Sequence, residues 1–110
     1  MEITSNRDGG TLHITVHGDL DHHAARVAIP EISKLIDVEL PLHLTLDFDG
    51  VSFMDSSGIA LVIGSYKKAT AFGGTFSLIN VPGQAYKVFS TAGICKLINI
   101  SAKNPAKASI

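Results

Sequence analysis

The sequence predicts an α/β domain: a small, mostly parallel β-sheet with an antiparallel hairpin at its N-terminus, flanked by helices. Segments in which every second residue is apolar alternate along the chain with segments in which apolar residues recur at the helical period. Such alternation is typical of strands joined by helical crossovers in a parallel sheet. With 110 residues, 45% of them hydrophobic, the chain is long and apolar enough for one core without disulfides or metal.

An N-terminal hairpin is the first predicted element. Residues 3–5 are typical of a short strand, and residues 7–10 carry an Asp-Gly-Gly turn, because glycine tolerates the positive φ angles of tight hairpins. The partner strand alternates apolar with polar residues, the pattern of a half-buried strand. Its apolar residues are Leu12, Ile14 and Val16. We expect this strand to end at Gly18.

A helix is predicted to begin after Asp21, whose side chain is a good N-cap. Its apolar residues follow the helical period: Ala25, Ala28, Ile32, Leu35 and Ile36. Pro30 falls inside this stripe, where it removes the hydrogen bond to the Arg26 carbonyl and kinks a helix. Proline is favoured at the first position of a helix, so Pro30 alternatively begins a second segment. The prediction is a kinked or two-part helix that stops at Pro41.

Two further core strands are predicted in the middle of the chain. Leucines and Phe48 alternate with polar residues over residues 42–48, which indicates a strand with one buried face. Residues 75–79 have the composition of a third core strand.

A helix connects these two strands in the prediction, running from Ile59 to Ala71. Two glycines, Gly73 and Gly74, follow it as a C-terminal stop. One face of this helix is apolar and consists of Ile59, Val62, Ile63 and Tyr66. We expect Val62 and Ile63 to lie in the core.

The C-terminal part predicts a short helix over residues 82–89 and then a final strand or helical turn over residues 97–100. The expected buried face of the short helix is Ala85, Val88 and Phe89. Residues 1–100 are therefore assigned to a single domain. Residues 101–110 mix Lys, Ala, Ser and Pro and are predicted to be a loose tail.

Charge and composition exclude several classes of function. Nine basic against ten acidic residues leave a formal net charge of -1, so there is no basic excess to neutralise a nucleic-acid backbone. No segment is long and apolar enough to span a membrane, and the N-terminus lacks the pattern of a signal peptide. The lone cysteine, Cys95, excludes an intramolecular disulfide framework and fits a reducing compartment. We expect a cytoplasmic protein that binds neither nucleic acid nor membrane.

Sequence motifs for catalysis and cofactor binding are missing. The chain lacks the nucleophile elbow, the phosphate-binding loop and the dinucleotide fingerprint, so we expect no catalytic residue and no cofactor. His22 and His23 are adjacent, point about 100° apart on a helix, and have no second cluster to complete a metal site. They are interpreted as part of the polar first turn that Asp21 caps. Cys95 has no motif partner and is interpreted as a buried, unreactive thiol.

The segment Asp55-Ser56-Ser57-Gly58 is the candidate functional segment. It follows a predicted strand and begins a helix, at the edge where α/β sheets carry their sites. One capping side chain would satisfy the free N–H groups of a helix start, yet three capping-type residues are adjacent here. A serine hydroxyl at a helix N-terminus also suits a phosphoryl group, because the N–H groups and the helix dipole attract a dianion. From spacing alone, a plain cap and a phosphorylation switch both stay open.

Two motifs make the chain resemble the STAS-domain anti-sigma factor antagonists. They are Gly-Asp-Leu-Asp-His-His-Ala at 18–24 and Phe-Met-Asp-Ser-Ser-Gly at 53–58, and weaker matches extend the resemblance over residues 3–100. The paired histidines and the Asp-Ser-Ser-Gly sequence resemble the sporulation sigma-F regulator type, because the general-stress type usually has Asp-Ser-Thr-Gly. The family fold is a small mixed sheet flanked by helices, which agrees with the α/β prediction.

The resemblance implies a binding switch rather than an enzyme. In this family the unphosphorylated protein binds an anti-sigma factor that is also a serine kinase, and thereby frees a sigma factor. The kinase phosphorylates the first serine of the motif, which is Ser56 here, and a PP2C-type serine phosphatase reverses the reaction. The loop 19–22 would lie beside Ser56. The implied partner-binding residues are Asp19, Asp21, His22, Asp55, Ser56, Ser57 and Gly58.

Two other classes of function stay open. The domain alternatively acts as a STAS-type scaffold, or as a ligand-responsive interaction module that does not act on a sigma factor. Only the antagonist should gain one phosphate from a cognate kinase and then lose binding. An enzyme would use Ser56 with Asp21 or His22 as its base, but it needs an oriented triad and the sequence names no third member.

Overall fold

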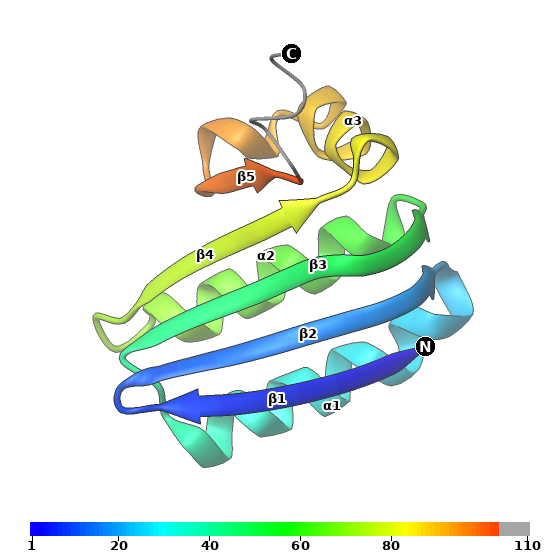
Figure 1. Cartoon of the computed structure of the whole chain (residues 1–110). Coiled ribbons are helices and arrows are strands. Elements are labelled where there is room, and N and C mark those ends of the chain that lie inside the picture. Colours follow the sequence, from blue (N-terminus) through cyan, green and yellow to red (C-terminus); the bar gives the residue numbers. More distant parts are fainter. Residues whose placement is uncertain (104–110) are drawn as a thin grey trace.

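The computed structural model describes residues 1–103 and contains one five-stranded mixed sheet, three α-helices and a short 3₁₀ helix. In chain order the elements are β1 (Glu2–Asp8), β2 (Thr11–Leu20), α1 (His22–Glu39), β3 (His43–Met54), α2 (Ser57–Thr70), β4 (Thr75–Val81), α3 (Gly83–Thr91), η1 (Ile94–Lys96) and β5 (Ile100–Ala102). The strands lie in sequence order; β1 is antiparallel to β2, and every later pair is parallel (Figure 1). The predicted fold class is confirmed.

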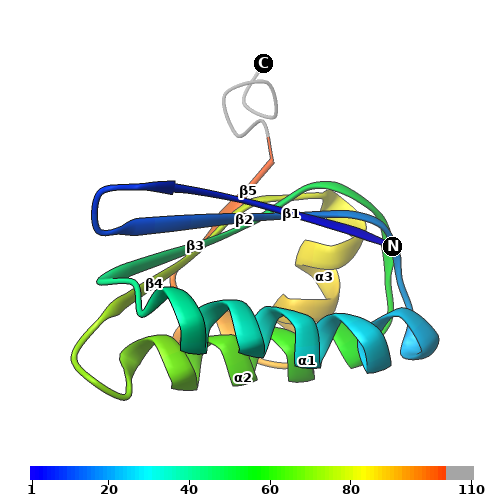
Figure 2. The same ribbon diagram turned by 90° about the horizontal axis from the view of Figure 1, so that it is seen from below.

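The three α-helices lie against one face of the sheet (Figure 2), and the core fills the space between them. The alternation in β2 decides which side chains enter it, because successive strand residues point to opposite faces. Leu12, Ile14 and Val16 are at most 1% exposed, as predicted. The opposite face, here called the open face, has no described helix on it and carries polar residues from three paired strands. They are His13, Thr15, Thr45, Asp47 and Ser77.

β2 does not end at Gly18, so that prediction is wrong. The strand continues to Leu20, which pairs with Met54 at the end of β3. Gly18 has φ +104, and the pairing register shifts between Gly18 and Asp19. Because glycine adopts this backbone angle without a side-chain clash, the strand bends there and stays paired with β3.

α1 is one continuous helix of 18 residues, and the alternative of two helical segments is wrong. Its buried stripe runs past the proline in a single phase: Ala25, Ala28, Ile32 and Ile36. Pro30 and Arg26 both lie on the exposed side, where water can hydrogen-bond the Arg26 carbonyl that loses its helical partner. The helix ends at Glu39, and Leu40 follows in the left-handed conformation with φ 45.

The buried face of α2 differs from the predicted one. Its buried residues are Gly58, Leu61, Val62, Ser65 and Ala69. Val62 lies in the core as expected, but Ile63 is only partly buried, so its core assignment is wrong. α2 packs beside α1 as well as on the sheet, which turns Leu61 and Ser65 inward. Ser65 tolerates burial because its hydroxyl donates to the Leu61 carbonyl at 2.8 Å.

The C-terminal segment has a helical turn, η1, just before the predicted range 97–100 and a strand, β5, that begins at its last residue, so residues 97–99 form neither predicted element. Val88 on α3 is partly rather than fully buried. Cys95 is exposed, so its prediction as a buried thiol is wrong; Ile94 and Ile98 take the inward positions of this segment. β5 extends the ordered fold through Ala102, beyond the predicted domain limit of residue 100. The predicted loose tail otherwise concerns residues 104–110, which lie outside the described residues.

Within residues 1–103, no helix has the length and apolar character that crossing a membrane requires.

Candidate functional site

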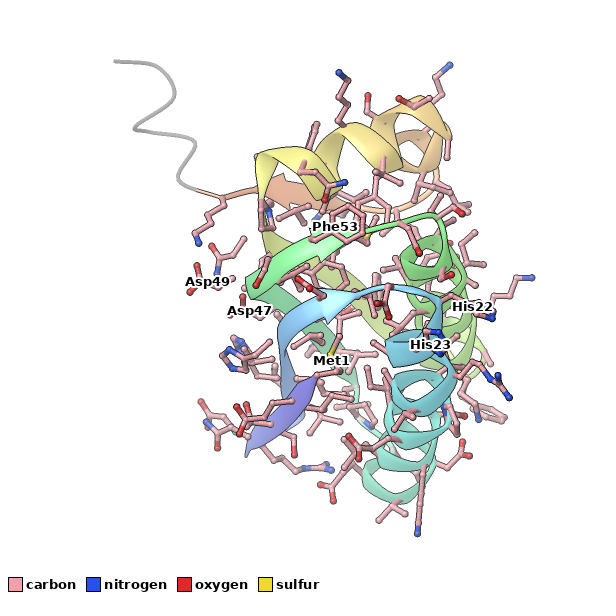
Figure 3. The ribbon with its side chains drawn as sticks, turned by 90° about the vertical axis from the view of Figure 1, so that its right-hand side faces the viewer. Met1, His22, His23, Asp47, Asp49 and Phe53 are labelled. Atoms are coloured by element: carbon pink, nitrogen blue, oxygen red, sulfur yellow. The ribbon has the colours of Figure 1, made fainter. Side chains whose placement is uncertain are left out.

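The ends of β2 and β3 bring the two candidate segments together. These strands are parallel neighbours, so both finish at the same edge of the sheet, where α1 and α2 begin. The Asp55 N–H donates to the Leu20 carbonyl at 3.3 Å and joins the two segments directly. Figure 3 looks onto this edge, with Phe53 near the end of β3 and His22 at the start of α1. The predicted proximity of residues 19–22 to residues 55–58 is present in the structure.

Asp55 caps α2. Its Oδ1 accepts a hydrogen bond from the Ser57 N–H at 2.8 Å, and its carbonyl accepts one from the Gly58 N–H at 3.1 Å. The hydrogen bond from the Ser57 N–H holds the pKa of the Asp55 carboxyl below its ordinary 3.8. Desolvation raises this pKa by less than that hydrogen bond lowers it, and the Ser57 side chain and His22 lower it further. Asp55 is therefore an ionised cap at neutral pH.

Ser56 is left free by this arrangement. It is exposed, its backbone is helical with φ -64 and ψ -15, and its side chain makes no capping hydrogen bond. Among the described residues, no carboxylate or imidazole hydrogen-bonds its hydroxyl, although a nucleophilic serine needs such a base. The structure therefore presents an accessible hydroxyl at a helix N-terminus, one residue after the carboxylate that does the capping.

Gly58 lets α2 begin in contact with the end of β3. A Cβ at Gly58 would lie 2.5 Å from Met54 Cγ, nearer still to its Sδ, and 3.2 Å from Leu20 Cδ2. Met54 and Leu20 are both fully buried and have little room to move. Gly58 is therefore required for the packing of α2 against Met54 and Leu20. Its neighbour Ser57 is half-buried, and the Ser57 N–H donates to Asp55 Oδ1.

The 19–22 segment contributes residues of different exposure. Asp19 is exposed at the end of β2, opposite Phe53, which is itself 44% exposed. Asp21 is half-buried, and its Oδ1 accepts from the Ala24 N–H at 2.9 Å, so the predicted N-cap is confirmed. The Asp21 carboxylate is thus bound to its own helix, while Leu20 and His22 make the link to Asp55.

The paired histidines form no metal site in residues 1–103. The rings of His22 and His23 are exposed and meet edge to face with centroids 6.0 Å apart. Among the described residues, no three His, Cys, Asp or Glu side chains gather closely enough to hold an ion.

A shallow groove of about 460 Å³ adjoins Ser56 and was not predicted. Its lining is mainly apolar and consists of Ser56, Ile59, Gln84, Lys87, Val88, Thr91 and Ala92. Val88 is only half-buried because it forms part of this wall. The amide of Gln84 also hydrogen-bonds both backbone groups of Met54. No local pattern indicates these contacts, since they join residues 30 positions apart in the chain.

Comparison with known proteins gives consistent similarities. The STAS domain profile matches residues 2–105. The anti-sigma F factor antagonist of Lysinibacillus sphaericus is 36% identical over 84 residues, covering 76% of this chain and 72% of the relative. The anti-sigma F factor antagonist of Paenibacillus polymyxa is 26% identical over 100 residues, which cover 91% of this chain and 86% of the relative. The solved structure of the Bacillus cell fate determinant SpoIIAA in the phosphorylated form has a TM-score of 0.69 and 28% identity, with 98% of each chain covered.

Proposed function

The chain belongs to the STAS-domain family, and we propose that it is an anti-sigma factor antagonist controlled by phosphorylation of Ser56. In this proposal the unphosphorylated chain binds an anti-sigma factor and thereby releases the sigma factor which that protein holds. The observation that carries it is the exposed Ser56 hydroxyl, free of capping at the start of α2. A partner of the transcription machinery implies that the chain acts in the cytoplasm.

The proposed modification adds charge where the free domain can accept it. A serine kinase would transfer the γ-phosphoryl group of ATP to Ser56 Oγ, and a PP2C-type phosphatase would hydrolyse the ester. Phosphoserine carries about -1.5 to -2 charges at neutral pH, and the α2 dipole favours them. The first N–H groups of α2 already bind Asp55 and Ser56 oxygens, so the phosphate gains little new hydrogen bonding there. The adjacent Asp55 carboxylate opposes it.

The proposed partner surface comprises the 19–22 segment, residues 55–58 and the groove beside Ser56. Its apolar side chains, such as Ile59 and Val88, supply area for burial, and Asp19 and Asp55 supply negative charge at the edge. In a complex the phosphate would be desolvated close to Asp55, where like charge and lost hydration are both unfavourable. Each loss of about 1.4 kcal/mol lowers affinity tenfold, so a few such losses are enough to release the partner.

The direct test uses the full chain, a purified anti-sigma factor kinase and ATP. We expect one phosphate on Ser56 and loss of binding after it is attached. Ser56→Ala should bind with or without ATP, Ser56→Asp should bind weakly, and Ser57→Ala is the matched control that should still be phosphorylated. Phosphate incorporated into Ser56→Ala would contradict the assignment of the site. A domain that binds the kinase yet gains no phosphate would instead act as a scaffold.

A substitution at Asp21 gives a second test, because it can separate the capping role of this residue from its proposed contact with the partner. Asn is also a good N-cap, so Asp21→Asn should change the free energy of unfolding by less than about 1 kcal/mol. Loss of the charge should still weaken binding to the anti-sigma factor. An affinity within twofold of the unmodified chain, measured by calorimetry, would remove Asp21 from the partner surface.

A further inference from the structure

The edge of β3 away from β2 loses its neighbouring strand before β3 ends. β4 pairs with β3 only as far as Asp47 and Ile79, whereas β3 continues to Met54. Successive residues of a strand direct their N–H and C=O groups to opposite edges. Asp55 donates toward β2, to the Leu20 carbonyl, so the backbone groups of Met54 point to the edge that β4 has left.

The side chain of Gln84 takes the place of the missing strand. The Met54 N–H donates to Gln84 Oε1 at 2.8 Å, and Gln84 Nε2 donates to the Met54 carbonyl at 2.8 Å. A primary amide carries the donor and the acceptor of a peptide group, so one residue of α3 completes the ladder at this point. Met54 is fully buried, and its backbone groups would otherwise lack a partner.

We propose that Gln84 is a positioning residue for Ser56, a role that rests on the proposed phosphorylation switch. Met54 lies two residues before Ser56, and its side chain is the surface on which Gly58 packs. Its backbone is held by the Gln84 amide on one edge, while the next residue, Asp55, is held by β2 on the other. The two attachments fix the Asp55 cap and the direction in which the Ser56 hydroxyl leaves the fold.

The position of Gln84 also connects α3 to the switch. Gln84 and Ser56 line the same groove, so a partner side chain that enters it contacts the phosphate acceptor and the residue that positions it. Binding in the groove and presentation of Ser56 are thereby coupled through one amide group.

The first test measures amide hydrogen exchange in the unphosphorylated full chain and needs no partner. Gln84→Leu removes both hydrogen bonds, so the Met54 amide should exchange at least about tenfold faster while amides of β1 and β2 keep their rates. Gln84→Glu keeps an acceptor for the Met54 N–H but cannot donate to its carbonyl, so Met54 should stay protected. Lys87→Leu, one turn further along the same groove wall, is the control for added apolar surface and should leave Met54 protected.

The second test measures phosphorylation of Ser56 by an anti-sigma factor kinase. Gln84→Leu should lower kcat at least about tenfold, because the hydroxyl is presented in the wrong direction, while its KM should change no more than that of Lys87→Leu, which alters the same groove wall. Gln84→Glu should fall between Gln84→Leu and the unmodified chain. If Gln84 only stabilised the fold, Gln84→Leu would speed amide exchange throughout the sheet. It would then not lower kcat more than it changes KM.

Two results overturn the inference: an unchanged Met54 exchange rate in Gln84→Leu, or an unchanged kcat despite faster Met54 exchange. Failure of the proposed function is distinguishable from both. In that case the unmodified chain takes no phosphate from the kinase. The exchange experiment then still decides whether Gln84 holds the end of β3.

Discussion

The Nε2–H of His13 donates to Oδ2 of Asp47 at 2.9 Å and joins β2 to β3 on the open face of the sheet. The other oxygen of Asp47 accepts from Asn80 Nδ2 at 3.1 Å and from the Asp49 N–H at 2.9 Å. Asp47 is 9% exposed. Burial by itself raises the pKa of its carboxyl, but the hydrogen bonds from Asp49, His13 and Asn80 outweigh burial and hold the pKa below 3.8.

This carboxylate should make folding depend on pH in the acid range. Because the folded-state pKa of Asp47 is depressed, its contribution is complete above the unfolded-state value near 3.8 and is lost as pH falls through the folded-state value. Asp47→Asn should lower the free energy of unfolding by about 1–3 kcal/mol at neutral pH, since the amide keeps one acceptor oxygen for three donors and sets its own NH2 group against at least one of them. Urea unfolding at a series of pH values should show this difference shrinking below pH 3.8. Asp8→Asn, in the exposed hairpin, is the control for loss of one charge. If the difference in unfolding free energy between Asp47→Asn and the unmodified chain were constant with pH, Asp47 would not be the source of the pH dependence.

Two glycines of α2 should respond oppositely to the same substitution. Gly58→Ala should destabilise by about 1–3 kcal/mol, because the new methyl group would overlap buried Met54. Gly64→Ala should stabilise by about 0.5–1 kcal/mol, since a Cβ there meets nothing within 4 Å and alanine favours the helix. Thermal or urea unfolding of both variants decides this. Equal effects of the two substitutions would mean that α2 does not pack on Met54.

Neighbouring residues of α2 test which of its faces is buried. Leu61 is 2% exposed, so Leu61→Ala should cost about 2–5 kcal/mol of unfolding free energy. Ile63 is only partly buried, so Ile63→Ala should cost at most about half as much. Both changes remove a comparable apolar side chain from the same helix. A larger loss for Ile63→Ala would restore the helix orientation that the apolar periodicity predicts.

Phosphorylation of Ser56 should act through local charge without refolding the domain. The α2 dipole favours the phosphate by about 0.3–1 kcal/mol, and the adjacent Asp55 carboxylate acts in the opposite sense, so stability should change little. Amide chemical shifts should therefore change only near residues 53–60 and in the 19–22 segment. Shift changes throughout the sheet would indicate a conformational switch instead.

Local sequence patterns were sufficient for most of the elements. Period-two alternation located the buried residues of β2, such as Ile14, because burial of one strand face requires that spacing. Capping chemistry located the start of α1, since an aspartate before a helix can satisfy its first N–H groups, and Asp21 does so. The proximity of residues 19–22 to Ser56 was expected from the family resemblance, and the parallel pairing of β2 with β3 explains it.

Other features depended on contacts that local patterns do not contain. The apolar stripe of α2 indicated Ile63, but packing against α1 turned Leu61 and Ser65 inward instead. No sequence motif indicated whether the Cys95 thiol faces the core or the solvent. In the structure Ile94 and Ile98 are buried in that segment, and Cys95 is exposed. Gly18 interrupted the alternation of β2, yet pairing with β3 continued to Leu20.

The sequence by itself therefore determined the α/β order of elements, the cap of α1 and the serine that follows β3, because each depends on residues a few positions apart. Only the tertiary structure decided that Asp55 caps α2 and leaves Ser56 free, that a groove adjoins this serine, and that Gln84 holds Met54. The physical reason is that backbone groups at the end of β3 must find partners wherever the fold supplies them. Here the fold supplied an amide from a helix 30 residues further along the chain.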